Sequence, residues 1–129
     1  MKMTAITNGW FASNGSGNFV ARNAKNEQYF APKRIMEALG LNEDEEIKFP
    51  LFAITGDQRI NESLGNGEYS EEVTVRPTVF ALYKSEDEMI AAYNADSEFE
   101  IKAKVRLAAT AKEAGLNDAA VKALLQAAI

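Results

Sequence analysis

Two residue types that carry much of enzyme chemistry are missing from this chain of 129 residues: it has no cysteine and no histidine. The first absence removes disulfides, thiolate catalysis and zinc–sulfur sites. The second removes the commonest general base and the commonest metal ligand. We therefore expect a protein that is not an enzyme, and we predict neither a cofactor nor a metal site.

Long hydrophobic runs are also missing. No apolar stretch approaches the roughly 18 residues that a membrane span requires, although 47% of the residues are hydrophobic. The first ten residues lack the apolar stretch of a secretory signal. We expect a soluble, cytoplasmic protein without a membrane partner, and the length favours a single domain with its own core.

Negative charge predominates, with a net charge of -5, but it is unevenly distributed. Residues 1–41 hold five basic and two acidic groups, residues 42–100 hold four and fifteen, and residues 101–129 hold five and two. Because salt screens charges beyond about 8 Å, local patches decide what a surface attracts. An acidic protein with a basic face is compatible with this distribution.

The first third of the chain predicts three short strands followed by a helix. Strand-favouring residues lie in 3–12, 17–23 and 27–32, separated by the Asn/Gly/Ser-rich loop "SNGSGN" and the polar turn "NAKN". The helix begins at Pro32, repeats apolar residues on one face, and ends at Gly40.

The middle of the chain predicts two further strands and a second helix. Residues 45–55 and 71–84 are rich in strand formers, with Pro50 marking an edge or a bulge and Pro77 a break. The polar residues 56–71 between them are expected to form a long loop. A short helix follows, with Ser85 as its N-cap.

The last part of the chain allows two interpretations of one segment. Residues 99–107 alternate strictly between apolar and charged side chains, which is the period of a strand, while a helix starting at Ser97 is the competing interpretation. Beyond them, residues 108–129 predict two short helices with Gly115 at the turn. Their apolar stripe is expected to pack on the rest of the protein or on another copy, and consists of Leu116, Val121, Leu124, Leu125 and Ile129.

These elements predict an α+β fold. It is a small OB-like antiparallel β-barrel with a helix between strands 3 and 4 and a C-terminal helical hairpin. We expect residues 1–107 to form the barrel domain and residues 108–129 to form a helical appendage. The apolar stripe of this appendage can be buried either against the barrel or against a second copy of the chain. Burial against a second copy would make a homo-oligomer.

The aromatic and glycine pattern of residues 4–56 resembles the cold-shock family of single-strand nucleic-acid-binding proteins. Trp10-Phe11, Gly15, Gly17-Asn18-Phe19-Val20 and Tyr29-Phe30 follow one another in the family's order, and "LNEDEEIKF" continues it. The chain has one aromatic and one lysine fewer in the glycine-rich segment, and Ala31-Pro32 stands where the family has Val-His. The resemblance implies an OB fold in which Trp10, Phe19 and Phe30, and less firmly Phe11 and Tyr29, stack on bases.

The residue types support the same chemistry without the resemblance. Single strands expose base faces to aromatic rings, while cationic side chains follow the phosphates. Because Trp10 and Phe11 are adjacent in a strand, they face opposite sides, so at least one lies outside the barrel interior. If residues 99–107 form a strand, three cations form a row about 6.6 Å apart. The candidate nucleic-acid-binding residues are Trp10, Phe11, Phe19, Arg22, Lys25, Tyr29, Phe30, Lys33, Arg34, Lys102, Lys104 and Arg106.

The leading hypothesis is a non-enzymatic protein that binds single-stranded DNA or RNA, of a kind that fits a phage or bacterial accessory protein. The second hypothesis is a protein-interaction module that uses the acidic middle and the Ala/Leu-rich tail. The third is a helix-turn-helix regulator of duplex DNA, because Ala111, Gly115 and Val121 have that motif's spacing. We rank it last, since its recognition positions 117–120 are poor in base-reading side chains.

Overall fold

The computed structural model describes residues 1–115, 117, 119–120 and 123. Leu116, Val121, Leu124, Leu125 and Ile129 lie outside the described residues, so the packing of the predicted tail stays a prediction. The elements are β1 (Lys2–Ile6), β2 (Asn8–Phe11), β3 (Phe19–Arg22), β4 (Gln28–Ala31), α1 (Lys33–Leu39), β5 (Leu51–Ser63), β6 (Tyr69–Tyr83), α2 (Glu86–Ala95) and α3 (Glu98–Glu113).

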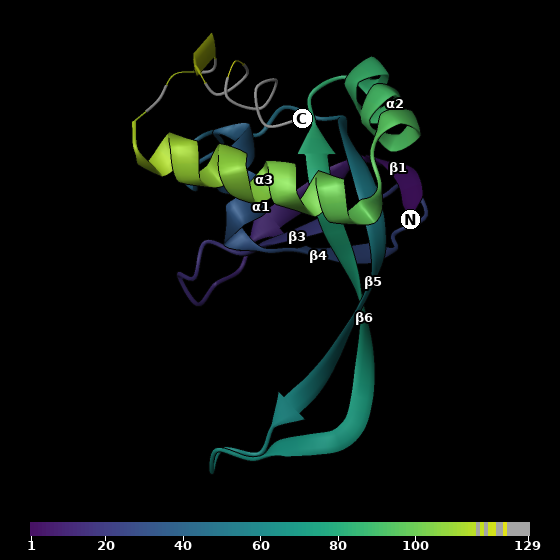
Figure 1. Cartoon of the computed structure of the whole chain (residues 1–129), viewed down its shortest axis with the longest axis vertical. Helices are drawn as coiled ribbons and strands as arrows, with labels where there is room; N and C mark the ends of the chain where they lie inside the picture. The colour runs from purple at the N-terminus through teal and green to yellow at the C-terminus, as the bar shows by residue number, and fades with distance from the viewer. Residues whose placement is uncertain (116, 118, 121–122, 124–129) are drawn as a thin grey trace.

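The six strands form one sheet that curls into a half-barrel, which confirms the α+β class (Figure 1). Their order is β1-β5-β6-β4-β3-β2, with β4 and β6 parallel and the other pairs antiparallel. The predicted first strand is divided at Thr7 into β1 and β2, which pair with different neighbours. The two edges of the sheet are therefore consecutive pieces of chain, which holds the sheet in its curl.

The concave side of the sheet holds the inner core. Its buried members include Ile6, Phe19 and Val79 from the strands and Ile35 and Met36 from α1. The α1 helix lies where it was predicted and ends at Gly40, which adopts the left-handed φ of 76° typical of a helix C-cap. Helix α1 thus closes the inner core while leaving the outer side of the sheet untouched.

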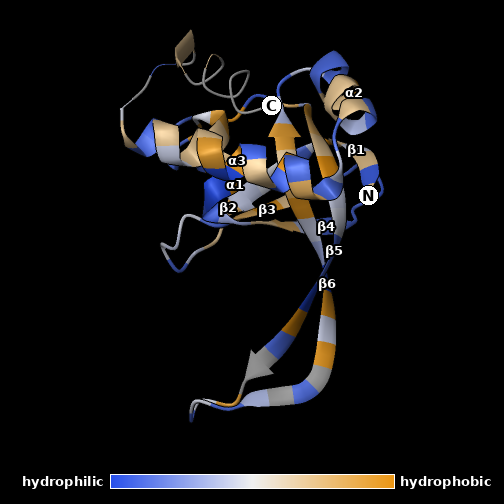
Figure 2. Cartoon of the chain, in the orientation of Figure 1, coloured by the Kyte–Doolittle hydropathy of each residue, from blue (hydrophilic) through white to orange (hydrophobic). Residues whose placement is uncertain are grey.

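The convex side of β5 and β6 is covered by α2 and α3. Ile54 and Phe80 from the strands pack there with Met89 of α2 and Ile101 of α3. Helix α2 begins as predicted at Ser85, whose side chain accepts a hydrogen bond from the Glu88 backbone N–H at 3.2 Å. Figure 2 shows hydrophobic residues concentrated in this upper part of β5 and β6.

Residues 99–107 are helical, so of the two interpretations the helix starting at Ser97 is confirmed and the strand is wrong. They belong to α3, which opens with a reciprocal capping box in which Ser97 and Glu100 bond each other's backbone N–H groups. The cap and the alanines that follow favour a helix more strongly than the alternation favours a strand. Helix α3 also continues without a break past residue 107, the predicted domain boundary.

Residues 56–71 are not a long loop, which corrects a second prediction. They belong to the outer half of the β5–β6 hairpin, and the strands are joined by residues 64–68 alone. We call residues 57–77 the arm, because in Figure 1 this part of the hairpin extends away from the body of the protein. Strand β6 runs through Pro77 without interruption, whereas β5 begins only at Leu51, after Pro50.

No helix among the described residues is long and apolar enough to cross a membrane. Over the same residues, no group of three or more acidic side chains is arranged to hold a metal ion.

Candidate nucleic-acid interface

The outer side of β2, β3 and β4 is the uncovered face of the sheet. Helix α1 packs into the inner core, and α2 and α3 cover β5 and β6, so in the described part of the chain no helix lies on this side. Figure 1 shows β3 and β4 at the lower boundary of the body, with α1 and α3 above them. We call this side the bare face.

Strand alternation places two aromatic rings on the bare face. Trp10 of β2 pairs with Val20 of β3, and Val20 pairs with Phe30 of β4. Directly opposed residues lie about 5 Å apart, so these three form a continuous row across the strands. Trp10 is 43% exposed and Phe30 is half-buried. The row offers two flat surfaces about 10 Å apart, which is twice the spacing between strands.

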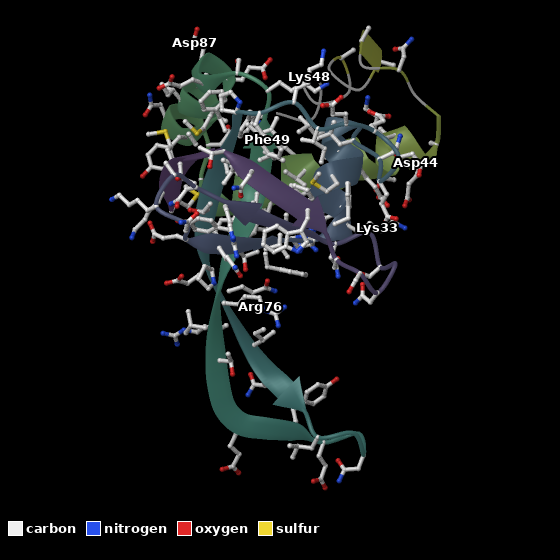
Figure 3. All side chains as sticks on the ribbon, turned by 180° about the vertical axis from the view of Figure 1, so that it is seen from behind. Lys33, Asp44, Lys48, Phe49, Arg76 and Asp87 are labelled. Atoms are coloured by element: carbon white, nitrogen blue, oxygen red, sulfur yellow. The ribbon has the colours of Figure 1, made fainter. Side chains whose placement is uncertain are left out.

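An arginine lies over each of the two rings. The Arg22 guanidinium carbon is 4.7 Å from the Trp10 ring centroid, and that of Arg76 is 4.9 Å from the Phe30 ring centroid. Arg22 comes from β3, whereas Arg76 comes from β6, where the arm leaves the body (Figure 3). Each ring is therefore paired with a cation that can reach a phosphate next to a stacked base.

Two predicted lysines lie in the segments that flank strands β2 to β4, and their side chains are not directed to the bare face: Lys33 Nζ pairs with Glu37 of α1 at 3.4 Å, and Lys25 lines a pocket together with Tyr29 and β1. Lys25 is exposed in the turn between β3 and β4, near Arg22, where its backbone N–H bonds Asn23 Oδ1. The Lys33 stem crosses the β2–β3 loop, with its Cγ 3.0 Å from the position that a Cβ would take on Gly17. Figure 3 places Lys33 toward the same side of the body as Arg76. Arg34 is the next residue and is also exposed.

Three of the predicted stacking residues lie on the inner side instead. Phe19 is fully buried, so it has no face to offer a base, and Phe11 meets it edge-on with ring centroids 5.2 Å apart. Tyr29 packs against the same core. Burial raises the pKa of Tyr29, with a smaller contribution from the Glu27 carboxylate. The expectation that Trp10 and Phe11 face opposite sides is confirmed.

The predicted cationic row of residues 102–106 does not exist, because these residues lie on α3. Lys102 Nζ pairs with Glu98 at 3.6 Å and lies 4.2 Å from the Phe80 ring centroid. Lys104 Nζ is 2.7 Å from Asp96 Oδ2, while Arg106 is exposed. On a helix, residues two apart do not share a face, so these three side chains do not extend the bare face.

Sequence reasoning missed Arg76 and Val20. Arg76 is far from Phe30 in sequence, and only the parallel pairing of Phe30 with Thr78 brings β6 beside β4. The signal for Val20 was available, since it is two residues from Arg22 in one short strand and shares its face.

An apolar cavity of about 470 Å³ lies away from the bare face, among α1, α2, α3 and the end of β6. The charged groups in its lining are Asp96 and Lys104, which already bond each other. This lining offers little to a phosphate chain.

Comparison with known proteins adds no relative: no protein-family model, no curated protein and no solved structure matches the chain.

Proposed function

We propose that this protein binds single-stranded nucleic acid across the bare face and has no catalytic role. The observation that carries the proposal is the row of Trp10, Val20 and Phe30, with Arg22 and Arg76 over its two rings. Stacking on aromatic rings combined with nearby cations is the chemistry that recognises unpaired bases and their phosphates.

The strand order supports an OB-like barrel. When β1 and β2 are counted as two halves of one strand, five strands remain, with a helix between the third and the fourth. This resembles the five-stranded Greek-key barrel whose second and third strands bind oligonucleotides. In this chain β3 and β4 take those two places and carry Val20, Arg22 and Phe30.

The acidic net charge is compatible with this function because most of the acids lie elsewhere, although Glu27 lies in the turn before β4. The strands β2 to β4 contain Arg22 and no Asp or Glu. Most acidic residues belong to residues 42–100. Since salt screens charges that are more than about 8 Å apart, phosphates on the bare face interact with its arginines more strongly than with those distant acids.

Fluorescence of Trp10 provides the test, because it is the single tryptophan of the chain. We expect oligo-dT or oligo-rU to quench it, with an affinity that falls steeply as salt is raised. Trp10→Ala and Phe30→Ala should each weaken binding by about 1–3 kcal/mol. Because Trp10→Ala removes the fluorophore, its binding is measured with a labelled oligonucleotide. The comparison of the two oligonucleotides shows which nucleic acid is preferred.

Phe99→Ala is the matched control. Phe99 is 79% exposed on α3, so this variant removes a more accessible ring from outside the bare face. It should bind like the unmodified protein. Equal losses in all three variants, or no quenching at low salt, would refute the proposal.

A further inference from the structure

The arm leaves the outer edge of β6 without a neighbouring strand. The parallel contact of β4 with β6 is at Thr78. Over residues 69–76, the strand pairing within the described chain therefore places β5 alone beside β6, and the outer edge of β6 toward the tip can accept a second strand. A two-stranded ribbon is marginally stable in water, so a further strand would stabilise the arm.

The free edge of β6 carries few of the features that discourage strand pairing. Natural edges are protected by lysine, proline or bulges. Residues 69–76 of β6 contain no lysine and no proline, while Pro77 lies at the root of the arm and the pairing of β5 with β6 is irregular between Asn61 and Ser63. Val73 and Val75 flank Thr74 and are 49% and 51% exposed. Three consecutive β-branched residues fit a pleated sheet well. Figure 2 shows hydrophobic bands along β6 within the arm.

The charges of the arm are complementary to those of a second arm running in the opposite direction. Arg59 and Arg76 lie toward its root together with Asp57, which leaves the root with a net positive charge, whereas Glu68 and Glu71 lie toward its tip, and all five are exposed. Antiparallel pairing brings each acidic tip beside the basic root of the other copy. The same acidic tip repels a phosphate chain, which argues against a nucleic acid as the occupant.

We propose that two copies of this chain pair through the outer edges of β6 in their arms, antiparallel and centred on Thr74. This register places Val73 opposite Val75 of the second copy, and Val75 opposite its Val73. Shifting the centre by one residue loses one of these two valine pairs, because a centre at 73 sets Val75 opposite Glu71 and a centre at 75 sets Val73 opposite Pro77. The contact is isologous, so it closes as a dimer with two-fold symmetry, and it joins the two arms into one four-stranded sheet.

The absence of cysteine allows a direct test by cross-linking. In Thr74→Cys, each new thiol faces its own copy across the two-fold axis. Opposed residues of antiparallel strands have Cα atoms about 4.5–5.5 Å apart, within the range that a disulfide spans. We expect this variant to form a disulfide dimer under mild oxidation much faster than Thr110→Cys, which places an exposed thiol on α3.

Two further variants test the register. Val73→Cys and Val75→Cys should each cross-link poorly alone, because like residues are then diagonal, but a mixture of the two should give a mixed dimer readily. A rate for Thr74→Cys that does not exceed that of Thr110→Cys would overturn the proposal.

Mass measured by sedimentation equilibrium gives a second readout that does not depend on cysteine. The unmodified protein should shift from monomer toward dimer as its concentration rises. Thr74→Lys, which opposes two like charges at the centre of the contact, should lose that shift. Gln58→Lys is the control, because it adds the same charge to the other edge of the arm and should still dimerise. A monomer at all concentrations, or equal behaviour of the two lysine variants, contradicts the pairing while leaving binding at the bare face untouched.

Discussion

The three strands β2, β3 and β4 carry aromatic rings on both of their faces, and the two faces differ in what covers those rings. On the inner side, Phe19 is fully buried and Phe11 packs against it. On the outer side, Trp10 and Phe30 are covered only in part, by Arg22 and Arg76. Within one short strand, residues on the inner face thus stabilise the core, while their neighbours on the outer face remain accessible.

Glycine makes the inner side possible. A Cβ on Gly9 would overlap the Phe19 ring and lie 2.6 Å from the Val20 carbonyl oxygen. Gly9 also stands between two exposed residues of β2, Asn8 and Trp10. The strand therefore approaches the core with its backbone on one side while presenting Trp10 on the other.

The largest expected effect is the loss of stability when the buried ring of Phe19 is removed from the inner side. Phe19→Ala should lower the free energy of unfolding by about 3–5 kcal/mol, since a fully buried ring leaves a cavity. Val20→Ala, one residue along and on the other face, should cost much less. Urea denaturation measures both. Similar losses for the two variants would mean that the faces do not differ as burial indicates.

The second prediction overfills the same side. Gly9→Ala should destabilise the protein by about 1–3 kcal/mol, because the added methyl group has no room beside the Phe19 ring. Adding Phe19→Leu should recover part of the loss, which makes the double variant more stable than the two single effects predict. Strict additivity in thermal or urea melts would argue against this contact.

The arrangement of the first three strands could be predicted from sequence because it depends on local signals. The turns "SNGSGN" and "NAKN" separate strands that alternate between core and surface. Which aromatic ring of each adjacent pair faces the core could not be predicted as easily. In Trp10-Phe11 and Tyr29-Phe30 the two rings lie on opposite faces of the strand, but this alternation does not say which face is buried. Burial by α1, which follows later in the chain, decides which ring of each pair is inside.

The strand interpretation of residues 99–107 and the predicted loop over residues 56–71 were wrong for different physical reasons. In residues 99–107, alternation competed with helix propensity and a capping box at Ser97, and the local signals for a helix prevailed. In residues 56–71, both faces of the hairpin are exposed, so no alternation of apolar residues is required and the sequence has the composition of a loop. Arg76 was missed for another reason: it lies in the predicted strand 71–84, but only the parallel pairing of β4 with β6 brings it to Phe30.

A third prediction compares a tyrosine in the part of the sheet that α2 and α3 cover with an exposed tyrosine of the arm. Tyr83 lies in the covered part, where burial, and then the carboxylates of Asp96 and Glu88, raise its pKa to about 12. An ordinary tyrosine has a pKa near 10. The folded state therefore holds the phenol proton more tightly than the unfolded state does.

The sign of the effect on stability follows from that difference. The contribution of Tyr83 is complete below pH 10 and is lost as the pH rises from 10 to about 12. We expect Tyr83→Phe to lose less stability than the unmodified protein over this interval, in urea melts at matched pH. Tyr69→Phe, which changes an exposed tyrosine of the arm, should follow the unmodified profile. Parallel curves for all three proteins would show that the phenol is not covered.

The smallest expected effect is on nucleic-acid affinity when Arg76, the cation over Phe30, is replaced by lysine. Arg76→Lys keeps the positive charge over Phe30 but loses the planar guanidinium, which stacks on a ring better than an ammonium does. If the proposed binding is correct, affinity for oligo-dT should fall by about 0.5–1 kcal/mol. The salt dependence should stay the same, because the number of cations is unchanged.

Arg59→Lys, on the arm and cross-strand from Val75, should bind like the unmodified protein. Titrations at several salt concentrations separate the two contributions. An unchanged affinity together with an unchanged salt slope would mean that Arg76 acts by charge alone and that its place over the ring has no part in binding.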